Sequence, residues 1–149
     1  MINYIVGDAT KPVGNDVKVI VHICNDIGAW GAGFVIPLGN KYPITKNVYK
    51  NSIDNRQLGN IQLIIVEKDI YVVNMIAQKG TTIINNQIPL KYDSLRLCLK
   101  KVVKEIPPNS SIHMPRIGCG LAGGKWSEVE KIINETIPNE IEVFVYDLE

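Results

Sequence analysis

Apolar stretches alternate along the chain with polar stretches that are rich in glycine, proline and asparagine. Val17–Cys24 is almost wholly apolar, which predicts a strand buried on both faces of a sheet. Shorter apolar runs predict five further strands, at Ile2–Val6, Ile61–Val66, Ile70–Ile76, Ser111–Pro115 and Glu140–Asp147. The polar Glu67–Asp69 between two of these runs predicts that they form a hairpin.

Helical periodicity is clearest in Leu90–Ile106, where Leu95, Leu99 and Val102 recur on one face. Three more helices are predicted, at Phe34–Lys41, from Pro43 to about Asp54, and from Trp126 or Ser127 onward. The polar Gln78–Pro89 predicts a loop.

The predicted order is strand, strand, helix, helix, strand, strand, helix, strand, helix, strand. This order is typical of an α/β protein, a three-layer α/β/α sandwich with a mixed, mostly parallel central sheet. The central hairpin argues against a purely parallel sheet. A chain of 149 residues fits a single domain that spans residues 1–149.

The amino-acid composition and the net charge limit the functions and the locations that we expect. Hydrophobic residues make up 46% and charged residues 21% of the chain, as in ordinary globular domains, and the net charge of +1 argues against a dedicated nucleic-acid binder. The three cysteines, Cys24, Cys98 and Cys119, lack metal-ligand spacing, so we expect no metal and no cofactor. They suit a reducing compartment. The sequence shows no signal peptide and no apolar run of about 18 residues, so we expect a cytoplasmic monomer without membrane contact.

Two glycine-rich segments, Asn25–Gly33 and Gly118–Gly124, each follow a predicted strand and precede a predicted helix. Ligands of α/β sheets bind beyond the carboxyl ends of the strands, and glycines let the backbone approach an anion closely. Neither segment is a Walker A motif or a dinucleotide fingerprint after the first strand. The pair predicts a phosphate-bearing nucleotide held from two sides. The alternative, that the glycines only serve tight turns, is weaker for two such segments than for one.

Three motifs carry a resemblance that covers nearly the whole chain. Val6–Thr10, His22–Gly33 and Pro115–Leu121 resemble the motifs of macrodomains, in macrodomain order. The second and third resemble the branch that holds ADP-ribose 1''-phosphate phosphatases and terminal ADP-ribose protein glycohydrolases. The resemblance implies that the partner is ADP-ribose or an ADP-ribosylated substrate.

The resemblance also implies roles for individual residues. Asp8 would accept a hydrogen bond from the adenine amine, and Asn25 would hold the distal ribose. The ordinary alternatives are a turn or cap role for both. Backbone N–H groups of the two glycine segments would hold the diphosphate, and aromatic residues would line the site or stack on adenine. The implied ligand-binding residues are Gly7, Asp8, Ala9, Asn25, Trp30, Gly31, Ala32, Gly33, Ile117, Gly118, Cys119, Gly120, Leu121, Ala122 and Tyr146.

Catalytic candidates are His22, Asn25 and Gln78. His22 stands where the yeast-type ADP-ribose 1''-phosphate phosphatase has histidine, and histidine can exchange a proton near pH 7. The alternative is an ordinary core histidine. The lysine and aspartate of the terminal glycohydrolase fall on Gln78 and Ala122, with Lys79 one position away. We therefore expect attack by water rather than a lysine adduct.

These features lead to one expected function and two alternatives. The expected function is a hydrolase that removes a phosphate or acyl group from C1'' of the distal ribose of ADP-ribose. The first alternative is a reader module that binds ADP-ribose without catalysis. The second is a binder of RNA or nucleic-acid ends, although we otherwise expect nucleic acid only as an ADP-ribosylated target.

Overall fold

The fold is built around one six-stranded sheet in a computed structural model that describes residues 2–149. The strands are β1 (Ile2–Val6), β2 (Val17–Asn25), β3 (Ile61–Glu67), β4 (Ile70–Gln78), β5 (Ser110–Met114) and β6 (Val143–Asp147). They lie in the order β1-β6-β5-β2-β4-β3. All neighbours are parallel except the β3–β4 hairpin, which confirms the predicted mixed, mostly parallel sheet.

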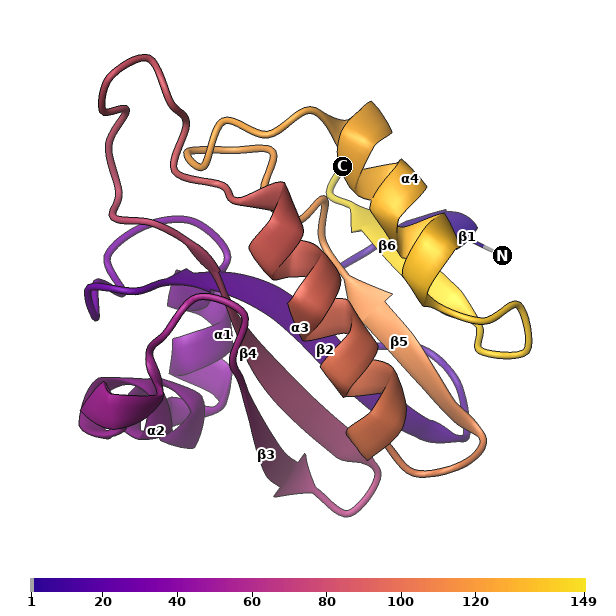
Figure 1. Ribbon diagram of the computed structural model, residues 1–149. Helices are drawn as coiled ribbons and strands as arrows, with labels where there is room; N and C mark the ends of the chain where they lie inside the picture. The colour runs from indigo at the N-terminus through magenta and orange to yellow at the C-terminus, as the bar shows by residue number, and fades with distance from the viewer. Residues whose placement is uncertain (1) are drawn as a thin grey trace.

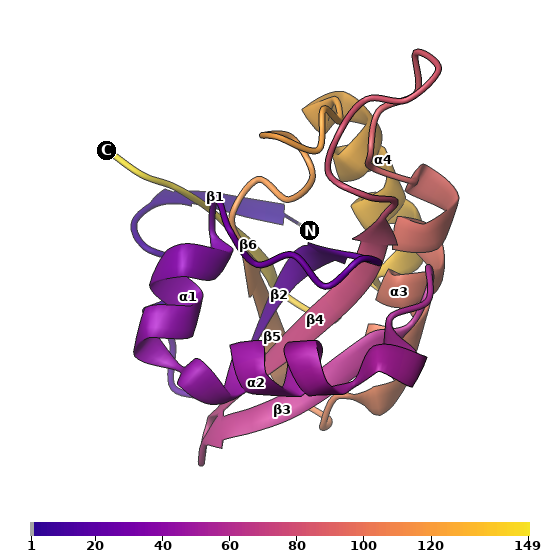
Figure 2. The same ribbon diagram turned by 90° about the vertical axis from the view of Figure 1, so that its left-hand side faces the viewer.

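Helices cover both faces of the sheet. The helices are α1 (Val35–Lys41), α2 (Pro43–Asn51), α3 (Tyr92–Glu105) and α4 (Trp126–Thr136), with a short 3-10 helix at Ile53–Asn55. Figures 1 and 2 show α1 and α2 on one side of the sheet and α3 and α4 on the other. The predicted three-layer sandwich is therefore confirmed.

Strand β2 forms the centre of the core, as its apolar sequence predicts. Val19 and Val21 face the cluster beneath α3 and α4, whereas Ile20 and Cys24 face the cluster beneath α1 and α2. Side chains of a strand point alternately to its two faces, so an unbroken apolar run fits only a strand that is covered on both.

Several predicted boundaries differ from the structure, and three of these differences have a local reason. The helix predicted from Leu90 begins at Tyr92, because Leu90 forms a bridge with Gln78 beside β4. The helix predicted to reach Asp54 ends at Asn51, and the chain continues as the 3-10 helix. The strand predicted from Glu140 begins at Val143, after a turn in which the Ile141 N–H donates to the Pro138 carbonyl.

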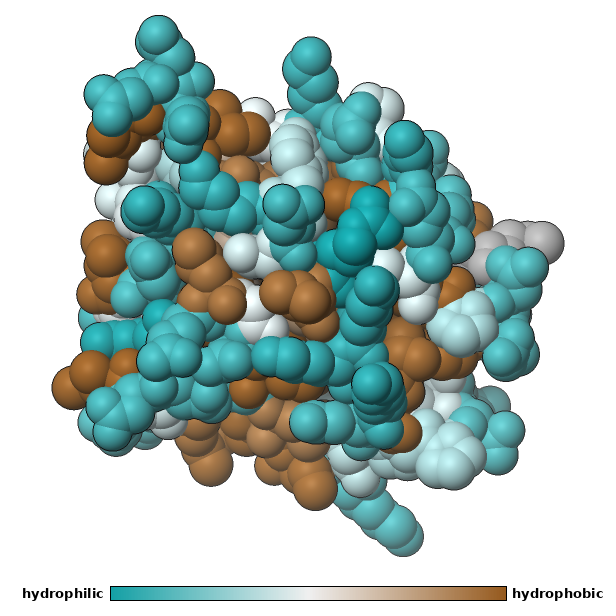
Figure 3. Space-filling model, in the orientation of Figure 1, coloured by the Kyte–Doolittle hydropathy of each residue, from teal (hydrophilic) through white to brown (hydrophobic). Residues whose placement is uncertain are grey.

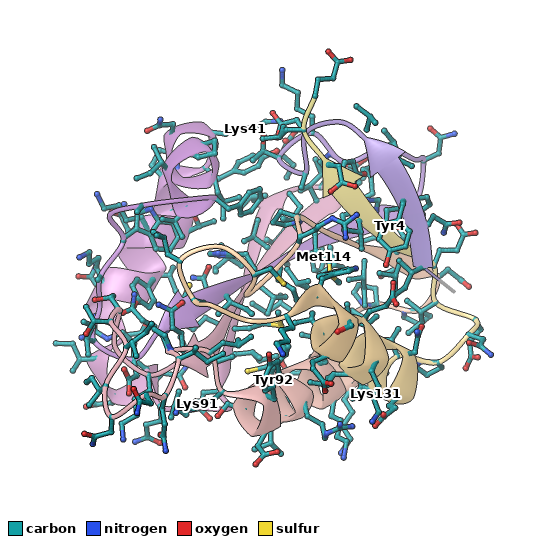
Figure 4. The ribbon with its side chains drawn as sticks, turned by 90° about the horizontal axis from the view of Figure 1, so that it is seen from above. Tyr4, Lys41, Lys91, Tyr92, Met114 and Lys131 are labelled. Carbon is teal, nitrogen blue, oxygen red and sulfur yellow. The ribbon has the colours of Figure 1, made fainter. Side chains whose placement is uncertain are left out.

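The carboxyl ends of the five parallel strands meet at one edge of the sheet, which Figure 4 views from above. Met114, the last residue of β5, lies near the middle of this view, between the α1–α2 layer and the α3–α4 layer. The segment after β5 crosses the centre of the edge. Segments that are far apart in the sequence therefore converge here.

On the face shown in Figure 3, hydrophobic residues are scattered among hydrophilic ones. The loop from Lys79 to Lys91 carries the exposed side chains of Ile83 and Ile84. Across residues 2–149, no helix combines the length and apolar character that a membrane span requires.

Candidate functional site

A cavity of about 220 Å³ opens at the edge where the strands end. One wall is the start of α1 with the residues before it, and the opposite wall is the segment that follows β5. The ends of β2 and β4 contribute the floor. The lining residues are His22, Ile23, Ala32, Gly33, Phe34, Val35, Gln78, Pro115, Arg116, Ile117, Gly118, Gly120, Leu121 and Ala122. The cavity thus brings both glycine segments together, as predicted.

The segment after β5 is folded tightly upon itself. The Gly124 N–H donates to the Gly118 carbonyl at 2.7 Å, and the Gly123 N–H donates to the Gly120 carbonyl at 3.0 Å. Gly118 has φ +74°, and a Cβ on Gly124 would stand 2.6 Å from the Gly118 oxygen, so glycine is required at both positions. This fold carries the intervening backbone along the cavity wall.

Several backbone N–H groups of the two walls have no partner within the chain. Over residues 2–149, the N–H groups of Gly118–Ala122 and of Ala32 and Gly33 make no backbone hydrogen bond. Consecutive N–H groups of this kind form a concave donor surface suited to an anion such as phosphate. Leu121 is 76% exposed, so its side chain extends into solvent and does not cover the backbone of the wall.

Asn25 organises the first glycine segment. Its Oδ1 accepts hydrogen bonds from the Ile27 and Ala29 N–H groups and from the Tyr49 hydroxyl, and its Nδ2 donates to the Ala29 carbonyl at 2.7 Å. Its side chain is buried. The turn role is therefore present in the structure, and contact of Asn25 with the distal ribose stays a prediction.

Tyr49, which sequence reasoning missed, is fully buried in α2 and donates its hydroxyl to the carbonyl and the side chain of Asn25. A tyrosine in an amphipathic helix carries no local signal for such a contact. It therefore could not have been assigned without the packing of α2 on β2.

His22 lines the cavity floor but is almost wholly buried. Its Nε2 lies 2.5 Å from Asn74 Oδ1. The Asn74 amide nitrogen donates to the Thr45 carbonyl, which can only accept, so the Asn74 oxygen must face His22. His22 Nε2 therefore carries the proton, and Nδ1 is left as an acceptor.

The same burial sets the charge of His22. Burial lowers the pKa of His22 to about 4, although the hydrogen bond with Asn74 opposes the shift. The ring lies 5.6 Å from the Trp30 ring and 5.9 Å from the Phe34 ring, measured between centroids. At neutral pH it is a neutral imidazole, suited to accept a hydrogen bond. Its catalytic role stays a prediction.

Gln78 lies at the end of β4 on the cavity floor, and its Nε2 donates to the Gly80 carbonyl at 3.0 Å. The neighbouring Lys79 instead lines a separate hollow with Ile84 and Lys91. The cavity wall has alanine at position 122, so the structure provides no acid there. Attack by water rather than by a lysine stays a prediction.

The β1 end of the site carries Gly7 and Asp8, and the Gly7 N–H donates to the Asp147 carbonyl of β6. Asp8 Oδ1 accepts hydrogen bonds from the Thr10 N–H and hydroxyl at 2.9 and 2.8 Å. Burial acts to raise the pKa of Asp8, but these bonds and nearby lysines outweigh it, so the pKa lies below its ordinary value. Asp8 is thus an ionised acceptor at neutral pH. Ala9 is buried.

Two predicted ligand contacts lie beneath the surface. Trp30 is 6% exposed and packs on Tyr49 and His22. Tyr146 is 4% exposed, and its ring lies directly under Gly7. Gly31 is open to solvent beside the cavity wall. Direct contact of these side chains with a ligand stays a prediction.

Cys119 lies half-buried in the second glycine segment, and its thiol donates to the Ile117 carbonyl. Burial raises the pKa of Cys119, which disfavours the thiolate form that a cysteine nucleophile requires. Within residues 2–149, no three His, Cys, Asp or Glu side chains gather as metal ligands.

Arg116 is a site residue that sequence reasoning did not single out. Arg116 lines the cavity, and its guanidinium forms a two-pronged ion pair with Asp147, through Nε at 2.6 Å and Nη2 at 3.0 Å. It also lies 5.2 Å from the ring centroids of both Tyr4 and Trp126. The ion pair joins the end of β5 to the end of β6, between the cavity and Gly7.

Comparison with solved structures identifies the family. A macrodomain protein from Streptomyces coelicolor is 38% identical, with a TM-score of 0.86 and 99% of both chains covered. The chain belongs to the macrodomain family. A protein of unknown function from Bacteroides thetaiotaomicron is 49% identical to this macrodomain, with a TM-score of 0.95 over 99% of this chain and 98% of that one. No family model matches the sequence.

Curated relatives of this macrodomain are more distant. The ADP-ribose 1''-phosphate phosphatase of Lodderomyces elongisporus is 28% identical, over 98% of this chain and 99% of the yeast protein. The chromodomain-helicase-DNA-binding protein 1-like of Danio rerio is 29% identical over 90% of this chain, but the chain spans only 14% of that protein's length. The macrodomain therefore matches the yeast protein from end to end and a small part of the other.

Proposed function

We propose that this macrodomain binds ADP-ribose along the edge where its parallel strands end. The observation that carries the proposal is the pair of opposed walls whose backbone N–H groups lack partners within residues 2–149. Such walls suit a diphosphate, which offers anionic oxygens to both sides.

The roles that the resemblance implies, combined with the order of the strands, give the ligand a direction along this edge. Adenine lies over β1 and β6, where ionised Asp8 accepts a hydrogen bond from its exocyclic amine. The diphosphate lies between the cavity walls over β5 and β2. The distal ribose reaches Asn25 and Gln78 over β2 and β4. The cavity is smaller than the roughly 300 Å³ at the lower end for small-molecule sites, so it encloses only the middle of this long ligand.

The proposed activity is hydrolysis of a substituent at C1'' of the distal ribose. A relative over the full length is named ADP-ribose 1''-phosphate phosphatase, which supports the same class of reaction here. Water supplies one hydrogen and one hydroxyl, and the products are ADP-ribose and the free acid, either phosphate or a carboxylic acid. Neutral His22 accepts a hydrogen bond from the water through Nδ1 and thereby orients it.

The proposal also covers the location of the protein, its domain organisation and its partners. A cytoplasmic location is supported by the three free cysteines. A single domain is supported by a sheet that joins β1 to β6, and a monomeric state is part of the same proposal. Nucleic acid enters only as a carrier of ADP-ribose, and the near-neutral net charge supports this restriction.

The test combines calorimetric titration of ADP-ribose with turnover of ADP-ribose 1''-phosphate. We expect Asp8→Ala to abolish measurable binding, whereas the control Asp93→Ala, an exposed acid on α3, leaves it unchanged. His22→Asn should retain binding and lose phosphate release. Binding without release of phosphate or an acyl group would make the protein a reader. Absence of binding by the wild-type protein would refute the proposal.

A further inference from the structure

The segment Gly7–Asp16 covers part of the sheet without forming a helix. Beneath it lies a chain of buried polar groups that the proposed reaction does not use. His113 of β5 is wholly buried, with its ring stacked on Phe144 at 5.0 Å between centroids, and its two ring nitrogens each lie 2.7 Å from a hydroxyl oxygen. These hydroxyls belong to Ser111 and Tyr146.

The backbone end of this chain has a defined direction. The Val13 N–H donates to the Tyr146 hydroxyl oxygen at 2.9 Å. The hydroxyls of Tyr146 and Ser111 each share a hydrogen bond with one ring nitrogen of His113, and the tautomer of His113 decides which group donates in each. A single tyrosine hydroxyl therefore links the covering segment to the interior of the sheet.

Other contacts fix the same segment, and they lie on either side of Val13. Lys41 of α1, labelled in Figure 4, donates to the Thr10 carbonyl at 2.6 Å. Lys18 donates to the carbonyls of Gly14 and Asp16 at 3.1 Å. The Tyr146 hydroxyl is thus the side-chain anchor of the middle of the segment.

The ring of Tyr146 supports the start of the same segment. A Cβ on Gly7 would stand 3.4 Å from the ring, so the backbone just before Asp8 rests on it. The carboxylate of Asp8 is in turn oriented by Thr10. Tyr146 therefore contacts the segment both before and after Asp8, although it does not reach the surface itself.

We infer that Tyr146 is a positioning residue for base recognition: it holds Gly7–Asp16 so that Asp8 faces the adenine amine. This inference rests on the proposed binding of ADP-ribose. Without the hydroxyl, the Val13 N–H and His113 Nδ1 lose their partners, and the segment reaches water by moving off the sheet. The conformation that reads adenine is then less populated, which weakens the apparent affinity by the same fraction.

The test compares ADP-ribose with its inosine counterpart, whose base has an oxygen in place of the exocyclic amine. The variant is Tyr146→Phe, which retains the ring under Gly7. The matched control is Tyr92→Phe, which removes a hydroxyl that accepts the Lys125 N–H at the start of α4. Both ligands are titrated calorimetrically, and exchange of the Val13 amide hydrogen is followed by NMR.

We expect wild type and Tyr92→Phe to prefer ADP-ribose over the inosine analogue. In Tyr146→Phe, ADP-ribose should bind about fivefold more weakly, with the analogue little changed and the Val13 amide exchanging faster. Equal weakening of both ligands, or unchanged selectivity with faster Val13 exchange, would overturn the inference alone. Failure of the wild-type protein to bind either ligand would overturn it together with the proposed function.

Discussion

Acid should unfold this protein through its histidines before its carboxylates. Burial lowers the pKa of both His22 and His113 to about 4, against 6.5 in an unfolded chain. Between these two pKa values, the unfolded state therefore binds protons that the folded state does not bind. The free energy of unfolding therefore has its full value above pH 6.5, where the histidines are neutral in both states, and it falls as the pH decreases toward 4.

The magnitude follows from the two pKa values. Relative to neutral pH, each histidine lowers the free energy of unfolding at pH 5 by about 2 kcal/mol, or by about 4 kcal/mol for the pair. Between pH 6 and pH 4.5, the two histidines together take up a little under two protons on unfolding, which gives a slope of about 2.3 kcal/mol per pH unit. Asp8, Asp69 and Asp147 have lowered pKa values, so their contribution is lost only in more acidic solution, below the ordinary value of 3.8.

The assay is urea unfolding at pH 7.5, 6 and 5, followed by tryptophan fluorescence. His113→Gln should halve the slope to about 1.2 kcal/mol per pH unit, because one histidine then remains. NMR titration should show neither native ring gaining a proton above pH 5. An unfolding free energy that stays constant from pH 7.5 to pH 5, or a native histidine that titrates near 6.5, would refute the reasoning.

Four further variants are compared with the wild-type protein by urea unfolding. Tyr49→Phe should lower stability by about 1–2 kcal/mol, because Asn25 loses a buried hydrogen bond; an unchanged midpoint would mean that Asn25 finds another donor. Gly124→Ala should lower stability by about 2 kcal/mol or more, because the added Cβ would collide with the Gly118 oxygen. At Gly33 the added Cβ would meet open space, so Gly33→Ala should lose only about 1 kcal/mol, from the unfavourable φ of +83°. Equal losses would contradict this distinction. Arg96→Ala breaks an exposed ion pair with Glu135 and should change stability by less than about 0.5 kcal/mol; a larger loss would show that the pair is not simply solvated.

The sequence predicted the layers and the cavity walls because both depend on local patterns. The apolar run of β2 requires cover on two faces, and glycine segments between a strand and a helix must turn at the strand ends. The pairing of β1 with β6 carries no such signal, since it joins residues about 140 positions apart. Strand order therefore had to come from the structure.

The orientation of two aromatic side chains, Trp30 and Tyr146, could not be predicted from the sequence. Trp30 and Tyr146 lie next to predicted binding segments, which suggested contact with a ligand. In the structure both support the backbone from beneath. Tyr146 belongs to β6 and Trp30 to the turn before α1, and adjacency in sequence does not determine whether such a side chain faces a ligand or packs beneath the backbone. The Arg116–Asp147 pair was missed because its partners come from different strands.

The pairing of β1 with β6 also bears on synthesis at the ribosome. Residues Ile2–Val6 lie at the sheet margin and find their backbone partners only in Val143–Asp147. During translation, β1 and the Asp8 segment must wait until β6 has left the exit tunnel. A nascent chain whose emerged part ends between the second glycine segment and β6 would hold both cavity walls but would leave β1 unpaired. Quality-control proteases would then meet an unpaired β1 strand, which distinguishes a chain without β6 from one that has it.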